Sequence, residues 1–231
     1  MRNSLHRLNS IARRLNDDEF IRLLEKGRPS AKLVDLGCGS GQFTLRCADR
    51  IATSNIWGVD VLDECLVAAE TKGIVAVKND LNKRLDFSDD FFDVAVSNQV
   101  IEHLIDIDTF VKEIYRILKP NGYAVISTVN LASWHNIWAL LLGWAPFAIN
   151  YSMNMRIGNP LNLDKDLEFP SSQHIRAFTT RVLREFFEER RFHVESLLGA
   201  GHYPMPTYIL TKVMSKIDPR HAVFLTVKVR K

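Results

Sequence analysis

The stretch VDLGCGSGQF, residues 34–43, gathers three glycines within five residues, between a short apolar run and a segment with helical spacing. A glycine-rich turn at the start of an α/β sheet lets the backbone come close to a ligand at the N-terminus of the next helix. The dinucleotide-binding motif needs a glycine where this chain has Gln42, and the P-loop needs Lys followed by Ser or Thr where it has Gln42 and Phe43. The turn therefore predicts a ligand site of a kind that neither phosphate motif describes.

Strand-like and helix-like segments alternate around this glycine loop. Apolar runs typical of buried strands occupy residues 31–36, 55–60, 74–80, 91–98 and 123–130. Apolar residues with helical spacing occupy 41–51, 62–73 and 107–118, and an N-terminal helix ends before Gly27 and Pro29. The alternation predicts βαβ units and a parallel sheet.

The alternation stops at residue 131 and resumes near residue 171. We expect the segment between them to be an insertion over the sheet edge. A helix at 179–191, a strand at 192–199, a helix at 208–217 and a strand within 221–230 are predicted to follow. In the last run, apolar residues from Val223 to Val229 alternate with a set that includes Thr226 and Lys228, which predicts a strand near the edge with one wetter face.

Composition narrows the class of protein. The chain has 231 residues, 46% of them hydrophobic, enough for one large domain with a full core. The 30 Lys and Arg residues barely exceed the 27 Asp and Glu residues, so a dedicated nucleic-acid surface is not expected. Cys38, Cys47 and Cys65 lack the spacing of a zinc site, which favours a reduced, cytoplasmic protein. The N-terminus has no continuous apolar run, so it is not expected to be a secretory signal.

Further motifs follow the glycine loop in order. Asp60 ends WGVD after the second strand, where a carboxylate can accept both hydroxyls of a ribose. Asp80 ends VKND after the third strand, and FFDVAVSNQVIEHL and LKPNGYAVIS cover the fourth strand and the entry to the fifth. Together with DLGCGSG, this series resembles the class I S-adenosylmethionine-dependent methyltransferases. The resemblance is dense over residues 31–129 and looser elsewhere.

The resemblance implies S-adenosylmethionine as the cofactor, held by residues of these motifs. They are Asp35, Gly37, Cys38, Gly39, Gly41, Asp60, Val61, Asp80, Leu81, Ser97 and Asn98. Asp35 would lie near the methionyl ammonium, with the amides around Gly37 and Gly39 near its carboxylate. Asp80 would meet the adenine amino group. In the alternative interpretation the glycines only form a tight turn and Asp35 caps the helix, but this leaves Asp60 and Asp80 unexplained.

The resemblance also implies a fold. It is an α/β, Rossmann-like sheet of seven mostly parallel strands with helices on both faces, an antiparallel last strand and a helical insertion. The whole chain would be a single methyltransferase domain. Its parts would be an N-terminal helical segment at 1–28, a cofactor-binding core at 31–129, an insertion or lid at 130–172 and the C-terminal part of the sheet at 173–231.

The end of the fourth strand bears on the methyl acceptor. Ser97 to Val100 differ from the Asn/Asp-Pro-Pro-aromatic motif of enzymes that methylate exocyclic amines of nucleic-acid bases. VIEHL, QHIRAFT and GAGHYPMP instead resemble O-methyltransferases of quinone precursors and methyltransferases of polysaccharide synthesis. In the quinone group two glutamates and a His can hold a divalent metal. This chain keeps Glu102 and His103 but has Gln99 at the first position, so no metal is predicted, although the metal alternative stays open.

Methyl transfer to a hydroxyl needs alignment and a base. His103 is the first candidate, with a solvated surface histidine as the alternative. His174 is the second, because QHIRAFT leads into a helix that should face the cleft. His135 and His202 are also predicted on the ligand-binding side.

Two segments outside the motifs could meet the acceptor. Trp134, Trp138 and Trp144 lie in the insertion, which is either a lid helix packed on the domain or an apolar acceptor pocket with peripheral membrane contact. Arg7, Arg13 and Arg14 of the N-terminal helix could meet an anionic acceptor, or could form a solvated face.

The sequence thus predicts a cytoplasmic S-adenosylmethionine-dependent methyltransferase. Its expected acceptor is a hydroxyl of a small molecule, a glycan or a lipid-linked precursor. An RNA or protein methyltransferase and a non-catalytic S-adenosylmethionine-binding protein are the alternatives. The oligomeric state and the methylated atom stay open.

Overall fold

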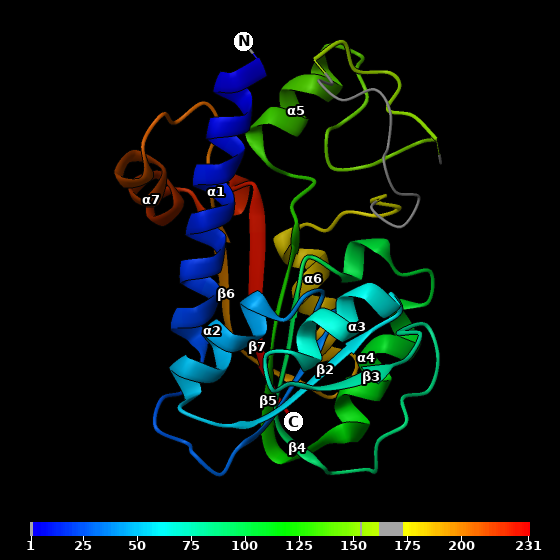
Figure 1. Cartoon of the computed structure of the whole chain (residues 1–231). Helices are drawn as coiled ribbons and strands as arrows, with labels where there is room; N and C mark the ends of the chain where they lie inside the picture. Colours follow the sequence, from blue (N-terminus) through cyan, green and yellow to red (C-terminus); the bar gives the residue numbers. More distant parts are fainter. Residues whose placement is uncertain (1, 153, 162–172) are drawn as a thin grey trace.

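The computed structural model describes residues 2–152, 154–161 and 173–231, which form a seven-stranded sheet in the order β3-β2-β1-β4-β5-β7-β6 (Figure 1). The strands are β1 Lys32–Leu36, β2 Asn55–Asp60, β3 Val75–Lys78, β4 Phe92–Asn98, β5 Leu118–Val129, β6 His193–Ala200 and β7 Phe224–Arg230. Only β7 among them runs antiparallel to its neighbours, β5 and β6. The predicted fold, with an antiparallel last strand, is confirmed.

Helices cover both faces of the sheet. They are α1 Arg2–Leu23, α2 Gln42–Ile51, α3 Asp63–Glu70, α4 Ile107–Ile117, α5 Trp134–Leu141, α6 Thr180–Glu188 and α7 Tyr208–Ile217. α1, α2 and α3 share one core with the sheet, and α4 and α6 share the other. Leu33 and Val34 of β1 enter opposite cores, as the two-residue period of a strand requires. Among the described helices, none has the length and apolar character of a membrane span.

β5 is longer than predicted. It begins at Leu118, which pairs with Phe92 of β4, rather than near residue 123. Pro120 disfavours helix at the residue before it, so the chain turns directly from α4 into extended structure. Asn121 then adopts a left-handed conformation, φ 65°, within the strand.

The insertion and β7 also differ from expectation. α5 lies beyond the carboxyl end of β5 rather than over the sheet edge (Figure 1), and residues 162–172 of the predicted insertion fall outside the described residues. The wetter face predicted for β7 is wrong: Thr226 and Lys228 are only 1% and 9% exposed. α1 packs on this strand, and Lys228 forms ion pairs with Glu25 at 3.1 Å and Glu195 at 3.0 Å.

A buried asparagine fixes α1 on the sheet. Asn16 is 2% exposed, and its Oδ1 accepts hydrogen bonds from Ser127 of β5 at 2.9 Å and Thr226 of β7 at 3.1 Å. Its amide nitrogen donates to Oδ1 of Asn98, the last residue of β4, at 3.1 Å. One side chain therefore ties α1 to three strands near their ligand-binding end.

We expect Asn16→Ala to lower the free energy of unfolding by about 2 kcal/mol, because it leaves two buried hydroxyl groups without their acceptor. Urea denaturation measures this. Ser10→Ala on the exposed side of α1, where the hydroxyl bonds the His6 carbonyl oxygen, is the control and should change stability by less than about 0.5 kcal/mol. Equal effects of the two variants would contradict the role given to Asn16.

Candidate functional site

The three glycines of the β1–α2 loop serve different purposes. All have positive φ, at 86° for Gly37, 50° for Gly39 and 79° for Gly41. A Cβ on Gly37 would lie 2.4 Å from a Val100 methyl, and one on Gly41 would lie 2.5 Å from Ile74. A Cβ on Gly39 would meet nothing within 4 Å. Gly37 and Gly41 thus permit tight packing, whereas Gly39 leaves open space in which a ligand can approach the backbone.

The amides of this loop are occupied within the protein. The Gly37 and Cys38 N–H groups donate to the Val59 carbonyl oxygen at 2.8 and 3.0 Å, and the Gly39 N–H donates to Oδ2 of Asp60 at 2.9 Å. The N–H groups of Gly37, Cys38 and Gly39 therefore have acceptors within the protein, and the expectation that amides around Gly37 and Gly39 meet a ligand carboxylate stays a prediction. These bonds lock the loop onto the end of β2.

Asp35 is buried beneath the loop. It is 2% exposed, and its Oδ2 accepts a hydrogen bond from the Thr44 hydroxyl at 2.6 Å. Loss of water raises the pKa of Asp35 to about 7, and the nearby Asp60 charge adds to the rise. Its partner is a side chain of α2 and not the helix backbone, so Asp35 does not cap this helix. A carboxyl in this state would ionise readily beside a ligand cation.

Asp60 is the last residue of β2, and Asp80 follows the end of β3 by two residues, so both lie at the carboxyl ends of neighbouring parallel strands. Asp60 is half-buried, and its Oδ1 accepts from the Val61 and Leu62 N–H groups at 2.8 and 3.1 Å. Asp80 accepts from the backbone N–H and side-chain amide of Asn82 at 3.0 and 2.8 Å, and these bonds lower its pKa. Both carboxylates are therefore held in fixed orientations at the carboxyl edge of the sheet.

The remaining predicted cofactor residues differ in how far their side chains are exposed and in what they contact. Val61 is 48% exposed beside Asp60, whereas Cys38 and Leu81 are buried in the two cores. Ser97 is fully buried and donates to the Leu36 carbonyl oxygen at 2.8 Å. The Asn98 side chain bonds Asn16 and Asp17 of α1. Of this group, only Val61 presents its side chain freely.

A second cluster joins Glu102, His103 and His174. Glu102 is fully buried, accepts from the Thr128 hydroxyl at 2.9 Å, and has its pKa raised to about 7 by loss of water. The His103 and His174 rings are 4.9 Å apart between centroids. Burial lowers the pKa of His103, and lowers that of His174 to about 3 with help from the His103 and Arg156 charges. At neutral pH both rings are uncharged.

His103 has a defined tautomer in this arrangement. It lies in the 3₁₀ turn Ile101–His103, half-buried, and its Nδ1 is 2.8 Å from the Gln173 carbonyl oxygen. A carbonyl only accepts, so Nδ1 carries the hydrogen and Nε2 keeps its lone pair. His103 is therefore a held, neutral imidazole rather than a solvated surface residue.

The same cluster has the composition of a metal site. Ligand atoms of Glu102, His103 and His174 lie within 4.8 Å of one another, a donor set that suits zinc or another transition metal. Gln99 lies next to these residues and has a left-handed backbone conformation, with φ 60°. With its side-chain amide nitrogen turned toward Glu102, Gln99 donates a hydrogen bond to Oε1 of Glu102 at 3.2 Å. The sequence pointed to Glu102 and His103 as a possible metal pair and to His174 as a second candidate base, but it did not predict that His174 would lie with Glu102 and His103 in one ligand set.

A cavity of about 640 Å³ lies beside this cluster, with His174 in its wall. It is bounded by the N-terminal half of α1, by α5 with the following loop, and by Tyr203. Trp134, Trp138 and Trp144 all line it, with Trp134 and Trp138 still 40% and 60% exposed. The predicted insertion is thus the wall of a large cavity next to the histidine cluster.

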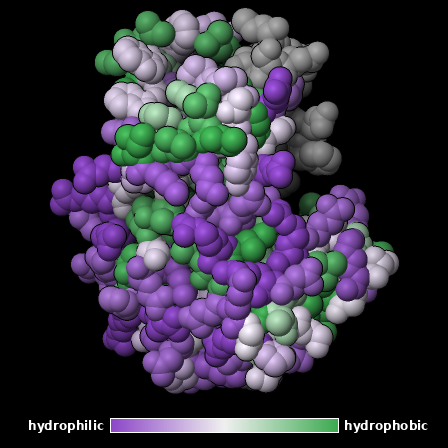
Figure 2. All heavy atoms as spheres, turned by 90° about the vertical axis from the view of Figure 1, so that its left-hand side faces the viewer, coloured by the Kyte–Doolittle hydropathy of each residue, from purple (hydrophilic) through white to green (hydrophobic). Residues whose placement is uncertain are grey.

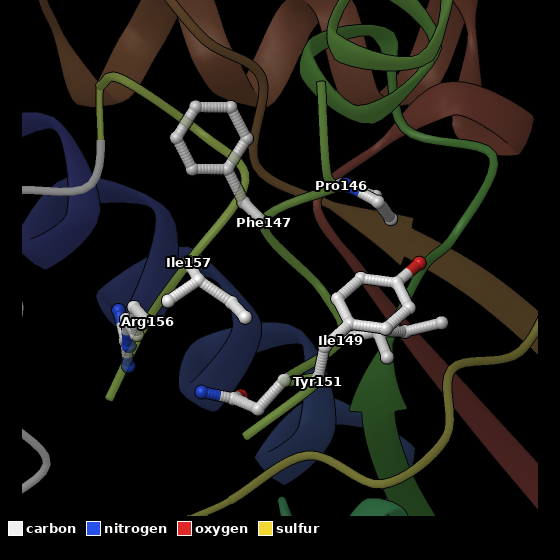
Figure 3. A pocket seen from close by; sticks show the side chains of 7 residues that line it. Pro146, Phe147, Ile149, Tyr151, Arg156 and Ile157 are labelled. Carbon is white, nitrogen blue, oxygen red and sulfur yellow. The ribbon is translucent and has the colours of Figure 1, made fainter. Parts of the chain in front are cut away.

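The cavity also has lining residues that were not singled out as site residues. Arg156 lies outside every motif, and Tyr203 lies within GAGHYPMP, where it was not assigned a role. Phe147 and Arg156 also border a much smaller pocket of about 10 Å³, built on the loop after α5 (Figure 3). His135, predicted on the ligand-binding side, lines the cavity; burial lowers its pKa to about 4, and its ring packs on Phe147 and Tyr203. His202 does not line the cavity; it is buried, with Nδ1 3.3 Å from the Ser215 hydroxyl.

The buried carboxyls predict a pH-dependent stability. In the folded state the pKa of Asp35 and of Glu102 is about 7, against an ordinary value near 4. Each therefore contributes stability that is full below about pH 4 and is lost as pH rises through about 7. Relative to wild type, Asp35→Asn and Glu102→Gln should gain stability between about pH 4 and about pH 7, by at most about 1.4 kcal/mol per pH unit.

Urea denaturation of wild type and variants at several pH values measures this difference. The buried histidines have lowered pKa values, so their contribution to the free energy of unfolding rises as pH increases toward 6.5. This contribution is the same in wild type and variants, and the difference between them therefore cancels it. Asp63→Asn, at an exposed position, should show a flat difference across the same range. A flat difference for Asp35→Asn would show that this carboxyl is ionised when buried.

Comparison with known proteins adds to this geometry. Residues 8–197 match the family model described as a methyltransferase domain. The chain is 31% identical over 155 residues to a ubiquinone biosynthesis O-methyltransferase of Rickettsia typhi, covering 62% of this chain and 60% of that protein. It is 31% identical over 143 residues to the mitochondrial ubiquinone biosynthesis O-methyltransferase of Bos taurus, covering 54% of this chain and 37% of that one. A malonyl-[acyl-carrier protein] O-methyltransferase of Erwinia billingiae is 30% identical over 129 residues, which cover 55% of this chain and 49% of that protein.

The chain thus spans between 37% and 60% of the lengths of these relatives. Solved structures share its fold at lower identity. An S-adenosylmethionine-dependent methyltransferase from Mesorhizobium loti superposes with a TM-score of 0.61 at 21% identity, covering 91% of this chain and 95% of that one. A methyltransferase from Archaeoglobus fulgidus gives 0.63 at 17% identity, covering 95% and 94%.

Proposed function

The chain belongs to the methyltransferase domain family, and on this premise we propose that it transfers the methyl group of S-adenosylmethionine to an oxygen of a small molecule. One observation carries the proposal. The histidine cluster borders a cavity of about 640 Å³, and Glu102 and His103 follow β4, the neighbour of the strand that leads into the glycine loop. Cofactor loop and acceptor cavity thus meet at the same end of the sheet, where α/β enzymes bind ligands.

The residues of the loop suit this cofactor. S-adenosylmethionine, when bound, supplies a methyl group on a positively charged sulfur that is a good leaving group. Asp35 and Asp60 would serve its ammonium and ribose hydroxyls, and Asp80 its adenine. The open space at Gly39 leaves room for its approach, and no lysine is needed because the ligand has no phosphate.

His103 is the better candidate for the base. Its Nδ1–H is fixed on the Gln173 carbonyl, which leaves Nε2 as a lone pair held in place. His174, whose pKa is about 3, accepts a proton much less readily. We assign His174 to the cavity wall, where an acceptor hydroxyl would approach the pair.

The acceptor class follows from the relatives and from the site. Two of the relatives above are named for ubiquinone biosynthesis and one for malonyl-acyl-carrier protein, and all three are O-methyltransferases. The aromatic cavity supports an acceptor with an apolar part. A cytoplasmic location and peripheral membrane contact through Trp134, Trp138 and Trp144 stay predictions.

Methyl transfer from S-adenosylmethionine labelled in its methyl group into a fractionated cell extract tests the reaction. We expect label in the small-molecule or lipid fraction, unchanged by a chelator, because Gln99 replaces the carboxylate that a metal would prefer. His103→Gln should lower the rate about a hundredfold, the usual contribution of a general base. His193→Gln, at an exposed position on β6, is the matched control and should leave the rate unchanged.

Each other outcome has a definite meaning. Label confined to RNA or protein would overturn the acceptor assignment, and loss of label with the chelator would place a metal in the cluster. Tight cofactor binding without any transfer would favour a binding protein that has lost turnover.

Cofactor binding can be tested separately from transfer. Asp60→Ala should raise the Kd for S-adenosylmethionine by about tenfold or more, because a charged acceptor is lost. Asp63→Ala, three positions along the chain and exposed, should leave the Kd within about twofold. Calorimetry measures both, and an unchanged Kd for Asp60→Ala would remove this residue from the cofactor site. A thermal melt of each variant monitors the loss of the Gly39 hydrogen bond.

A further inference from the structure

The acceptor cavity has a one-sided charge. Of the described residues that line it, none is Asp or Glu, whereas Arg13 comes from α1 and Arg156 from the loop after α5. The net charge that these described residues present to the cavity is therefore positive.

The two guanidinium groups differ from most other arginines of the protein. Arg46, Arg116 and Arg230 each form ion pairs with carboxylates. Among the described residues, Arg13 and Arg156 have neither an ion pair nor a hydrogen bond, and both are exposed at the cavity boundary. Their guanidinium groups carry ten N–H donors in total at the boundary of the cavity, and none of these donors has an acceptor among the described residues.

Both arginines line the cavity that has His174 in its wall. Arg13 comes from α1 and Arg156 from the loop after α5, so elements far apart in the sequence bring two guanidinium groups to one cavity. Two guanidinium forks at one cavity form a typical binding site for an oxyanion.

The rest of the cavity is apolar and large. Trp138, Trp144, Phe147 and Leu142 contribute to its walls. A volume of about 640 Å³ lies within the range of pockets that enclose a small organic ligand. A ligand that matches this lining has an apolar body and one anionic group.

We infer that the acceptor is an amphipathic oxyanion, whose carboxylate or phosphate is bound by Arg13 and Arg156 and whose apolar body packs on Trp138 and Phe147. The inference rests on the proposed function in one respect, since it identifies the bound ligand as the methyl acceptor. The anion-binding site itself does not depend on methyl transfer. Arg13 and Arg156 are then specificity residues that place the acceptor beside His103 and His174.

A pair of matched dyes tests the site without any S-adenosylmethionine. 1-Anilinonaphthalene-8-sulfonate is an amphipathic anion, and N-phenyl-1-naphthylamine is the same molecule without the sulfonate. Fluorescence titration should give the anionic dye at least about tenfold tighter binding to the wild-type protein. In the double variant R13Q R156Q that preference should disappear, with the neutral dye bound as before within about twofold.

The control variant R181Q R184Q removes the same charge from α6, at exposed positions outside the cavity lining, and should keep the wild-type preference. Decanoate and decyl phosphate should displace the anionic dye from the wild-type protein, whereas decanol should not. The tighter of the two anions would distinguish a carboxylate from a phosphate ligand. Equal binding of both dyes to wild type, equal displacement by decanol, or loss of preference in R181Q R184Q would overturn the inference.

This titration and the labelling experiment fail independently. Dye selectivity without methyl transfer would keep the anion site and remove the enzyme function. Methyl transfer without dye selectivity would keep the enzyme and remove the anion site.

Discussion

The position of α1 on the sheet determines both halves of the site. Asn16 of this helix bonds strands β4, β5 and β7 at once, next to Asn98, where β4 ends. The next residue, Asp17, accepts hydrogen bonds from the Asn98 amide and from Arg46 of α2, so the same helix is tied to the element that follows the glycine loop. Arg13, on the turn before, lines the acceptor cavity. A displacement of α1 would therefore change the cofactor side and the acceptor side together.

The buried carboxyl groups of Asp35 and Glu102 lower the stability of the fold at two positions of the candidate site. Asp35 and Glu102 are each hydrogen-bonded by one threonine hydroxyl, from Thr44 and Thr128, and neither has a basic side chain bonded to it among the described residues. An apolar residue in either place would cost the fold less. Because the loop amides are already bonded to Val59 and Asp60, the features left to select a ligand are carboxyls and open backbone. Such a site favours a cationic ligand over a phosphate.

The sequence patterns predicted the helices and strands but not the contacts between segments that are far apart in the sequence. β2 was placed at 55–60 and α7 at 208–217, both with the observed ends, because local periodicity and turn residues define them. The alternation in β7 wrongly predicted a wet face, since the partners of Lys228 are Glu25 and Glu195, far away along the chain. QHIRAFT pointed to His174 as a candidate base, but its position beside Glu102 depends on contacts between segments far apart in the sequence. Arg156 lies outside every motif, and only the folded structure shows that it lines the same cavity as Arg13.

The charges of the two sides are opposite, and this bears on how a methyl group could pass between them. Asp35, Asp60 and Asp80 lie on the side of the glycine loop, and Arg13 and Arg156 lie on the cavity side. A positively charged donor and a negatively charged acceptor would each be attracted to its own side, which orders them before reaction. In the proposed reaction the donor sulfur would lose its positive charge, the proton of the acceptor hydroxyl would pass to His103, and the anionic group held by Arg13 and Arg156 would keep its charge. The two arginines would therefore act on binding and orientation, whereas His103 would receive the proton that the new oxygen–carbon bond displaces.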